Sequence, residues 1–132
     1  MSKTRIATVV STDTHYLHDI RVGRFELQAD EPLALGGGDR APAPFDYYLA
    51  SLSACTAITL RMYAERKGWD LGELRVELAL SFDDEGRPRI HRTLYANGGL
   101  DDAQWTRLLE IVANTPVTKA MREGATITST RG

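Results

Sequence analysis

The stretch PFDYYLASLSACTAITLRMYAERK, residues 44–67, decides the fold of this chain. Pro44 suits the first position of a helix, and Gly68 follows the basic residues that crowd the last turns, where cations favour a helix end. These signals predict one helix over residues 44–67. From Tyr47 to Leu60 the helix is apolar or small on every face, whereas a surface helix carries a charged stripe. We therefore expect it to be enclosed by a sheet or by a second subunit.

The segments before this helix alternate between apolar and polar residues, as strands do. This pattern covers residues 5–11 and 25–29. Residues 12–23 form either a long hairpin end or a third short strand over residues 19–22. The stretch DEPLALGGGDRAPAP, residues 30–44, contains three consecutive glycines and several prolines, so it predicts a loop that continues neither regular structure.

The segments after the helix predict a hairpin, two helices and a last strand. Residues 74–82 and 89–96 alternate around a turn. An apolar stripe at helical spacing follows Asp101 and Asp102, and this helix should stop near Asn114, because a proline at position 116 disfavours helical geometry in the preceding residue. Residues 116–122 fit a short helix ended by a glycine, and residues 125–130 look like a strand. With no repeat and no linker, residues 1–132 are predicted to form a single α+β domain.

Charge and hydropathy exclude several partners. Sixteen basic against eighteen acidic residues give a net charge of −2, without the basic excess of a nucleic-acid binder, so we expect neither nucleic acid nor a membrane as partner. The longest uncharged stretch, residues 47–60, falls short of the roughly 20 residues that span a bilayer. The start MSKTRIATVV lacks the features of a signal peptide, which predicts a cytoplasmic protein.

Cys55 is the single cysteine of the chain. It therefore forms no intrachain disulfide and no cysteine-based metal site, and the three histidines lack ligand spacing, so we expect neither a metal nor a cofactor. One interpretation makes Cys55 a small apolar residue of a buried helix. The other makes it a reactive thiol.

A reactive Cys55 must be a thiolate, which requires a nearby cation, a helix N-terminus or a base to lower its pKa. It lies eleven residues past Pro44, beyond the first turn of its own helix. An arginine from a loop would meet the requirement, and Arg40 is the preferred candidate, with Arg21 and Arg24 as alternatives. Asp46 either fixes such an arginine through a bidentate pair or favours the start of the helix.

Residues 27–69 contain the glycine-rich loop, a Pro-x-Pro helix entry, an acidic residue and a small apolar run that ends in Ala-Cys-Thr. With these features the segment resembles the OsmC/Ohr superfamily (osmotically inducible protein C / organic hydroperoxide resistance). NTPVTKAM, residues 114–121, resembles the second motif of that family. The resemblance implies an OsmC-like fold, in which two central helices pack against antiparallel sheets within an intertwined homodimer. It also implies active sites at the subunit interface.

In the peroxidase branches of the superfamily, the cysteine that matches Cys55 attacks the peroxide, while an arginine and an acidic residue orient its thiolate. A second cysteine just before Pro-Val then resolves the sulfenic acid. Asp46 matches the acidic position of one branch, but Thr115 stands at the place of the second cysteine. The chain thus resembles an OsmC-like branch that lacks the second cysteine, and an external thiol must reduce the oxidised Cys55.

Two hypotheses follow. The first is a thiol-dependent peroxidase of oxidative or osmotic stress defence that reduces organic or hydrogen peroxides, with Cys55 as nucleophile, Arg40 stabilising negative charge and Asp46 positioning Arg40. The second is a non-catalytic dimer of the same fold that binds a small ligand or senses redox state. The missing second cysteine favours the second hypothesis.

Overall fold

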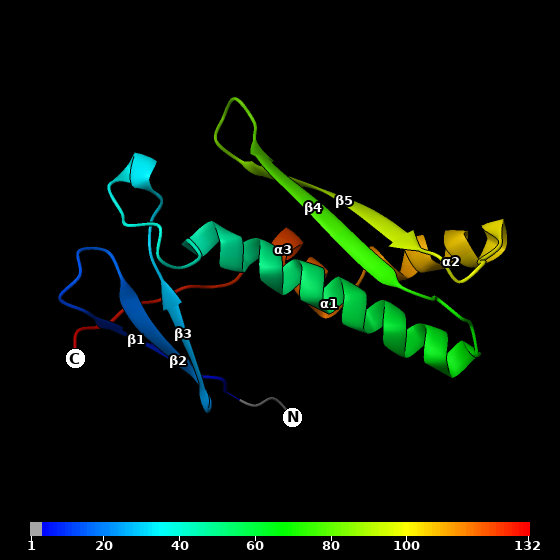
Figure 1. Cartoon of the computed structure of the whole chain (residues 1–132), viewed down its shortest axis with the longest axis horizontal. Helices are drawn as coiled ribbons and strands as arrows, with labels where there is room; N and C mark the ends of the chain where they lie inside the picture. Colours follow the sequence, from blue (N-terminus) through cyan, green and yellow to red (C-terminus); the bar gives the residue numbers. More distant parts are fainter. Residues whose placement is uncertain (1–3) are drawn as a thin grey trace. The chain divides into compact units, whose positions relative to one another are not determined.

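The computed structural model of the chain describes residues 4–132 and has an α+β architecture, with three α-helices and two antiparallel sheets (Figure 1). The chain divides into two compact units, one up to Tyr48 and one over Leu49–Gly132. Each unit is described by itself below. No helix of the described part is long and apolar enough to cross a membrane.

The first unit is a three-stranded sheet in the order β1-β2-β3. Its strands are β1 (Ala7–Ser11), β2 (His18–Val22) and β3 (Phe25–Ala29). The third short strand that the sequence left as an alternative is therefore present, and Gly23, with a positive φ of 59°, lies in the tight turn that follows it.

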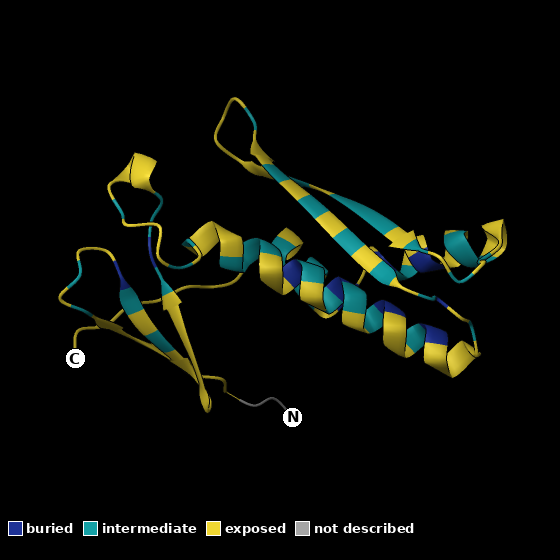
Figure 2. Cartoon of the chain, viewed as in Figure 1, coloured by how far each residue is buried: buried dark blue, intermediate teal, exposed yellow. Residues whose placement is uncertain are grey.

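The two faces of this sheet differ in polarity, because side chains alternate along each strand. The register places Val9, Ile20 and Leu27 opposite one another on an apolar face. The other face carries polar pairs such as Arg21 with Glu26, whose side chains form an exposed ion pair of 2.7 Å. Leu27 is 41% exposed and Val9 55% exposed, so the apolar face is largely uncovered in the single chain (Figure 2).

The glycine-rich loop is organised around Asp30, which is buried. Its carboxylate accepts hydrogen bonds from the backbone N–H of Glu31 at 2.8 Å and of Arg40 at 3.1 Å, which closes the loop. Gly37 lies so close to Glu31 that an added Cβ would come within 2.0 Å of its carbonyl oxygen. The segment is a loop, as predicted, and Leu33–Leu35 form a single 3-10 turn, η1, within it.

Helix α1 (Pro44–Lys67) has the predicted bounds. Its buried residues recur every fourth position, at Leu52, Thr56, Leu60 and Ala64, which places them in one stripe (Figure 2). Away from this stripe, Ile58 is 59% exposed. Within one chain the helix is therefore covered on one side only.

The second unit contains a hairpin and two further helices, α2 (Asp102–Val112) and α3 (Pro116–Glu123). The hairpin pairs β4 (Leu74–Phe82) with β5 (Pro88–Ala96) in antiparallel register, as predicted. Asp101 begins α2 with a capping box, in which its carboxylate accepts from the N–H of Gln104. The core of the unit joins α1 to α2 and to the segment before β4, through Leu60, Ala64, Leu71, Leu108 and Val112.

The predicted last strand is absent from the structure, where residues 125–132 have no regular secondary structure. Ile127, at 85% exposed, packs against little of the described chain. Alternating sequence alone does not make a strand, because the backbone N–H and C=O groups of a strand need a partner strand.

Candidate functional site: a half-buried thiol between two helices and an arginine

Cys55 is half-buried in the middle of α1 and directly precedes Thr56. The Thr56 side chain is completely buried, and its hydroxyl donates to the carbonyl oxygen of Leu52, one turn earlier, at 2.7 Å. The same hydroxyl oxygen accepts a hydrogen bond from the guanidinium of Arg92 at 2.8 Å. The buried stripe of α1 thus brings a cation next to the residue that follows the cysteine.

Arg92 occupies an inward position of β5 and binds three separate segments. Its Nη1 donates to Oγ1 of Thr56 and, at 3.0 Å, to Oγ1 of Thr118 in α3. Its Nη2 donates to the carbonyl oxygen of Val112, the last residue of α2, at 2.7 Å. One guanidinium therefore links α1, the end of α2 and the start of α3 by hydrogen bonds.

The N-terminus of α3 faces the thiol. Thr115, buried, caps this helix and accepts from the N–H of Thr118 at 3.3 Å, and Pro116 follows at the first helical position. The backbone N–H of Val117, which has no partner within its own helix at this position, points to the thiol closely enough to lower the pKa of Cys55. The positive end of the α3 dipole is therefore close to the sulfur.

These surroundings set the pKa of Cys55. Burial is the largest single influence and raises the pKa of the thiol, because it disfavours the charged form. The N–H of Val117, the hydroxyls of Thr115 and Thr59 and the charge of Arg92 together outweigh burial, so the pKa of Cys55 lies below its ordinary value. For Arg92, burial lowers the pKa of the guanidinium and the Cys55 thiolate raises it. The site favours a thiolate.

Besides Cys55, the sequence analysis named an acidic residue, Asp46, and the arginines at positions 21, 24 and 40 as candidates for the site. All four make their contacts within the first unit. Asp46 accepts from the backbone N–H of Ala43 at 2.9 Å, as the third residue of a helix does in a capping box, and residues 4–132 contain no ion pair between it and Arg40. Arg21 pairs with Glu26, and the guanidinium of Arg24 lies 4.7 Å from the centre of the Phe25 ring.

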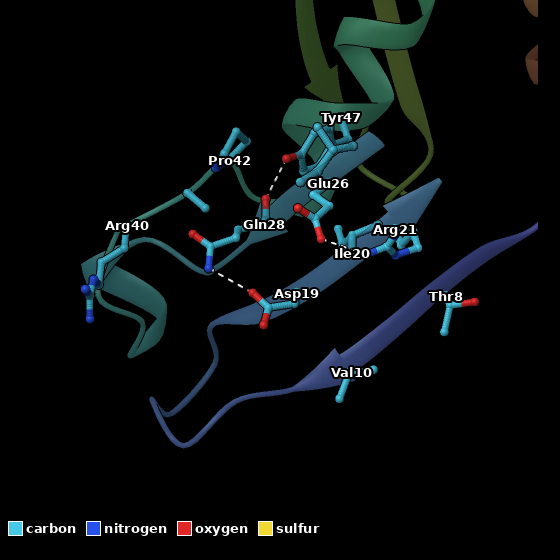
Figure 3. Close-up of a pocket in the computed structure, with 12 residues that line it drawn as sticks. Thr8, Val10, Asp19, Ile20, Arg21, Glu26, Gln28, Arg40, Pro42 and Tyr47 are labelled. Carbon is cyan, nitrogen blue, oxygen red and sulfur yellow. Dashed lines mark hydrogen bonds and ion pairs between the residues drawn. The ribbon is translucent and has the colours of Figure 1, made fainter. Parts of the chain in front are cut away.

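Arg40 lies at one end of a pocket on the polar face of the β1-β2-β3 sheet (Figure 3). The floor of this pocket carries the hydrogen bond from Gln28 to Asp19, 2.9 Å long. The hydroxyl of Tyr47 donates to the backbone carbonyl of Gln28 at its edge. The catalytic roles of Arg40 and Asp46 remain predictions.

Sequence reasoning missed Arg92 and the N-terminus of α3. Within the second unit, Arg92 of β5 is a cation that acts on Cys55, and the helix N-terminus near the sulfur is that of α3. One signal was available. Arg92 stands between Ile90 and Leu94 on the inward face of an alternating strand, where an arginine requires buried partners.

No group of three or more His, Cys, Asp or Glu side chains among residues 4–132 is arranged to hold a metal ion. Around Cys55, the site offers a thiol with neighbouring hydrogen-bond donors and a cation. Fold and site together define an α+β protein with a single activated cysteine.

Comparison with known proteins gives the family. The family model described as OsmC-like protein matches residues 36–130, so the chain belongs to the OsmC-like protein family. This confirms the resemblance seen in the sequence. No curated protein matches the chain.

Solved structures share the fold at low sequence identity. An OsmC-like protein from Mycoplasma pneumoniae has a TM-score of 0.73 at 16% identity, over 92% of this chain and 89% of that one. An organic hydroperoxide resistance protein OsmC from Legionella pneumophila has a TM-score of 0.67 at 22% identity, over 91% and 90%. An organic hydroperoxide resistance protein from Elizabethkingia anophelis, with thiocyanate bound, has a TM-score of 0.69 at 22% identity, over 92% and 90%.

Proposed function

We propose that this chain is a thiol-dependent peroxidase that reduces organic or hydrogen peroxides in the cytoplasm through Cys55, in defence against oxidative or osmotic stress. The observation that carries the proposal is the placement of the Cys55 sulfur at the N-terminus of α3 and near Arg92, which lowers the pKa of the thiol. A thiolate is the form of cysteine that attacks peroxides. The names of the similar structures, which refer to organic hydroperoxide resistance, support the same chemistry.

The reaction needs one thiolate and an external reductant. The Cys55 sulfur attacks one peroxide oxygen, the O–O bond breaks, and the other oxygen leaves as an alkoxide or hydroxide that takes up the proton lost by the thiol. Sulfur is oxidised by two electrons to a sulfenic acid, and the peroxide is reduced to an alcohol or water. Because the chain has no second cysteine, an external thiol condenses with the sulfenic acid and releases water. A second external thiol then restores Cys55 and leaves as a disulfide.

A homodimer is part of the proposal. The apolar face of the β1-β2-β3 sheet and the exposed side of α1 leave large apolar side chains uncovered, among them Val9, Leu27 and Ile58. Exposed apolar area of this kind is typical of protein interfaces. A second copy of the chain would cover it, as the intertwined dimer implied by the family resemblance does.

Trapping of the sulfenic acid tests the proposed activity. The purified protein is treated with a few equivalents of cumene hydroperoxide or hydrogen peroxide in the presence of dimedone, and its intact mass is measured. We expect a rapid dimedone adduct on Cys55 and none on the Cys55→Ser variant. An unchanged mass with both oxidants would reject the peroxidase and favour the non-catalytic dimer.

A further inference from the structure

We propose that Arg92, rather than an arginine of the glycine-rich loop, is the cation that stabilises the Cys55 thiolate and the charge on the leaving oxygen, and that Thr56 and Thr118 position it. This inference rests on the proposed peroxidase function. Arg92 was not among the residues that the sequence analysis singled out.

Arg92 lacks a counter-charge among the side chains that bind it. Its hydrogen-bond partners are two hydroxyls and a carbonyl, all of them neutral. Four other arginines, at positions 21, 75, 87 and 107, each form an ion pair with a carboxylate, whereas none of the carboxylates in residues 4–132 pairs with Arg92. A half-buried charge without a counter-ion is costly, so an anion is expected beside it. The Cys55 thiolate supplies that anion.

The guanidinium of Arg92 has more N–H donors than its partners in the described part of the chain use. An arginine has five N–H donors and stays protonated in proteins. Both donors on Nη1 and one on Nη2 hold the group against Thr56, Thr118 and Val112. The Nε donor and the second Nη2 donor have no partner in the described part of the chain. They are free to bind an oxygen of the substrate.

Negative charge moves away from the sulfur during the proposed reaction. When the sulfur attacks, its negative charge passes to the oxygen that leaves as the O–O bond breaks. A fixed cation in a partly buried site stabilises that charge without having to reorganise. Arg92 meets this condition, because its three hydrogen bonds to three different elements fix it in place.

The experiment measures the rate of Cys55 alkylation by iodoacetamide against pH and the rate of cumene hydroperoxide consumption with an external thiol. The variants are Arg92→Gln, Arg92→Lys and Arg40→Gln. Arg89→Gln is the matched control, because Arg89 is an exposed arginine of the same strand and its replacement changes the net charge equally. Thr56→Val removes one hydroxyl that positions Arg92, and Thr56→Ser keeps it.

We expect Arg92→Gln to lower both rates about tenfold at neutral pH, which corresponds to about one unit in the pKa of the thiol. Arg92→Lys should be intermediate, because a lysine keeps the charge but lacks the planar group that reaches all three acceptors. Arg89→Gln should react as the wild type does, and Arg40→Gln should lose less of either rate than Arg92→Gln. Thr56→Val should shift the pH profile in the same direction as Arg92→Gln, and Thr56→Ser should restore it.

Wild-type rates in Arg92→Gln would overturn the inference, and so would an equal loss in Arg89→Gln. A loss in Arg40→Gln with none in Arg92→Gln would return the role to the loop. If Arg92→Gln does not fold, as judged by circular dichroism, the threonine variants decide, because wild-type rates in Thr56→Val would reject a positioned arginine. Failure of the peroxidase itself is seen separately, as a wild-type protein that is alkylated quickly but consumes no hydroperoxide.

Discussion

At the scale of the residue, the chemistry of Cys55 is decided by groups distant in the sequence. Its neighbours on α1 include no charged side chain, and an isolated helix would leave it an ordinary thiol. Val117 and Thr115 approach it from α3, and Arg92 approaches it from β5. A cysteine introduced at position 115 can test directly how close Thr115 lies to the sulfur.

Thr115→Cys should create a disulfide with Cys55. The Thr115 hydroxyl is within hydrogen-bonding reach of the sulfur, and a cysteine there would occupy the place of the missing second cysteine. After mild oxidation we expect most of the variant to lose two hydrogens in mass and both free thiols. Thr106→Cys, an exposed position of α2, is the control and should keep two free thiols within each chain. Equal behaviour of the two variants would contradict the geometry of the site.

Sequence reasoning identified Cys55 and the conditions that a thiolate needs, but not the groups that meet them. The sequence favours Arg40 because the glycine-rich loop could fold over the helix. Arg92 contacts Thr56 and Thr118, which are 36 and 26 residues away in the chain. Such pairings depend on how the hairpin and the helices pack, which no local pattern encodes.

At the scale of the element, local sequence signals predicted the ends of a helix wherever its capping residues and its apolar periodicity agreed. Pro44 and Gly68 bounded α1, and Asp101 and Pro116 separated α2 from α3, as predicted. Prediction failed for residues 125–130, whose strand-like alternation has no pairing partner within the described chain. In the β1-β2-β3 sheet, apolar and polar residues also alternate, which predicts that the apolar face is covered. The single chain leaves most of this face exposed.

Leu27→Lys should weaken a homodimer that buries this apolar face. Leu27 lies in the central row of the face, beside Ile20, and burying a lysine charge there is unfavourable. Light scattering after size exclusion should give a dimer mass for the wild type and a monomer mass, or a dissociation constant raised at least about tenfold, for the variant. Thr8→Lys, on the polar face of the same sheet, is the control and should remain dimeric. A monomeric wild type would reject the dimer.

At the scale of the whole molecule, folding lowers the pKa of Cys55 and so raises the fraction of thiolate at neutral pH. Because the pKa of Cys55 is lowered in the folded chain, the thiolate also stabilises the fold. This contribution is present above the pKa of the unfolded thiol and is lost as the pH falls through the lower pKa of the folded one. The fold and the reactivity of Cys55 are thus coupled.

The most direct test is the pH dependence of Cys55 alkylation by iodoacetamide in the native wild-type chain and in the same chain unfolded in urea. The single cysteine makes the signal unambiguous. The account predicts that the rate rises with pH at a lower midpoint in the native protein, which therefore has the larger fraction of thiolate at neutral pH. Equal midpoints, or a higher midpoint in the native protein, would contradict it, because burial would then outweigh α3 and Arg92.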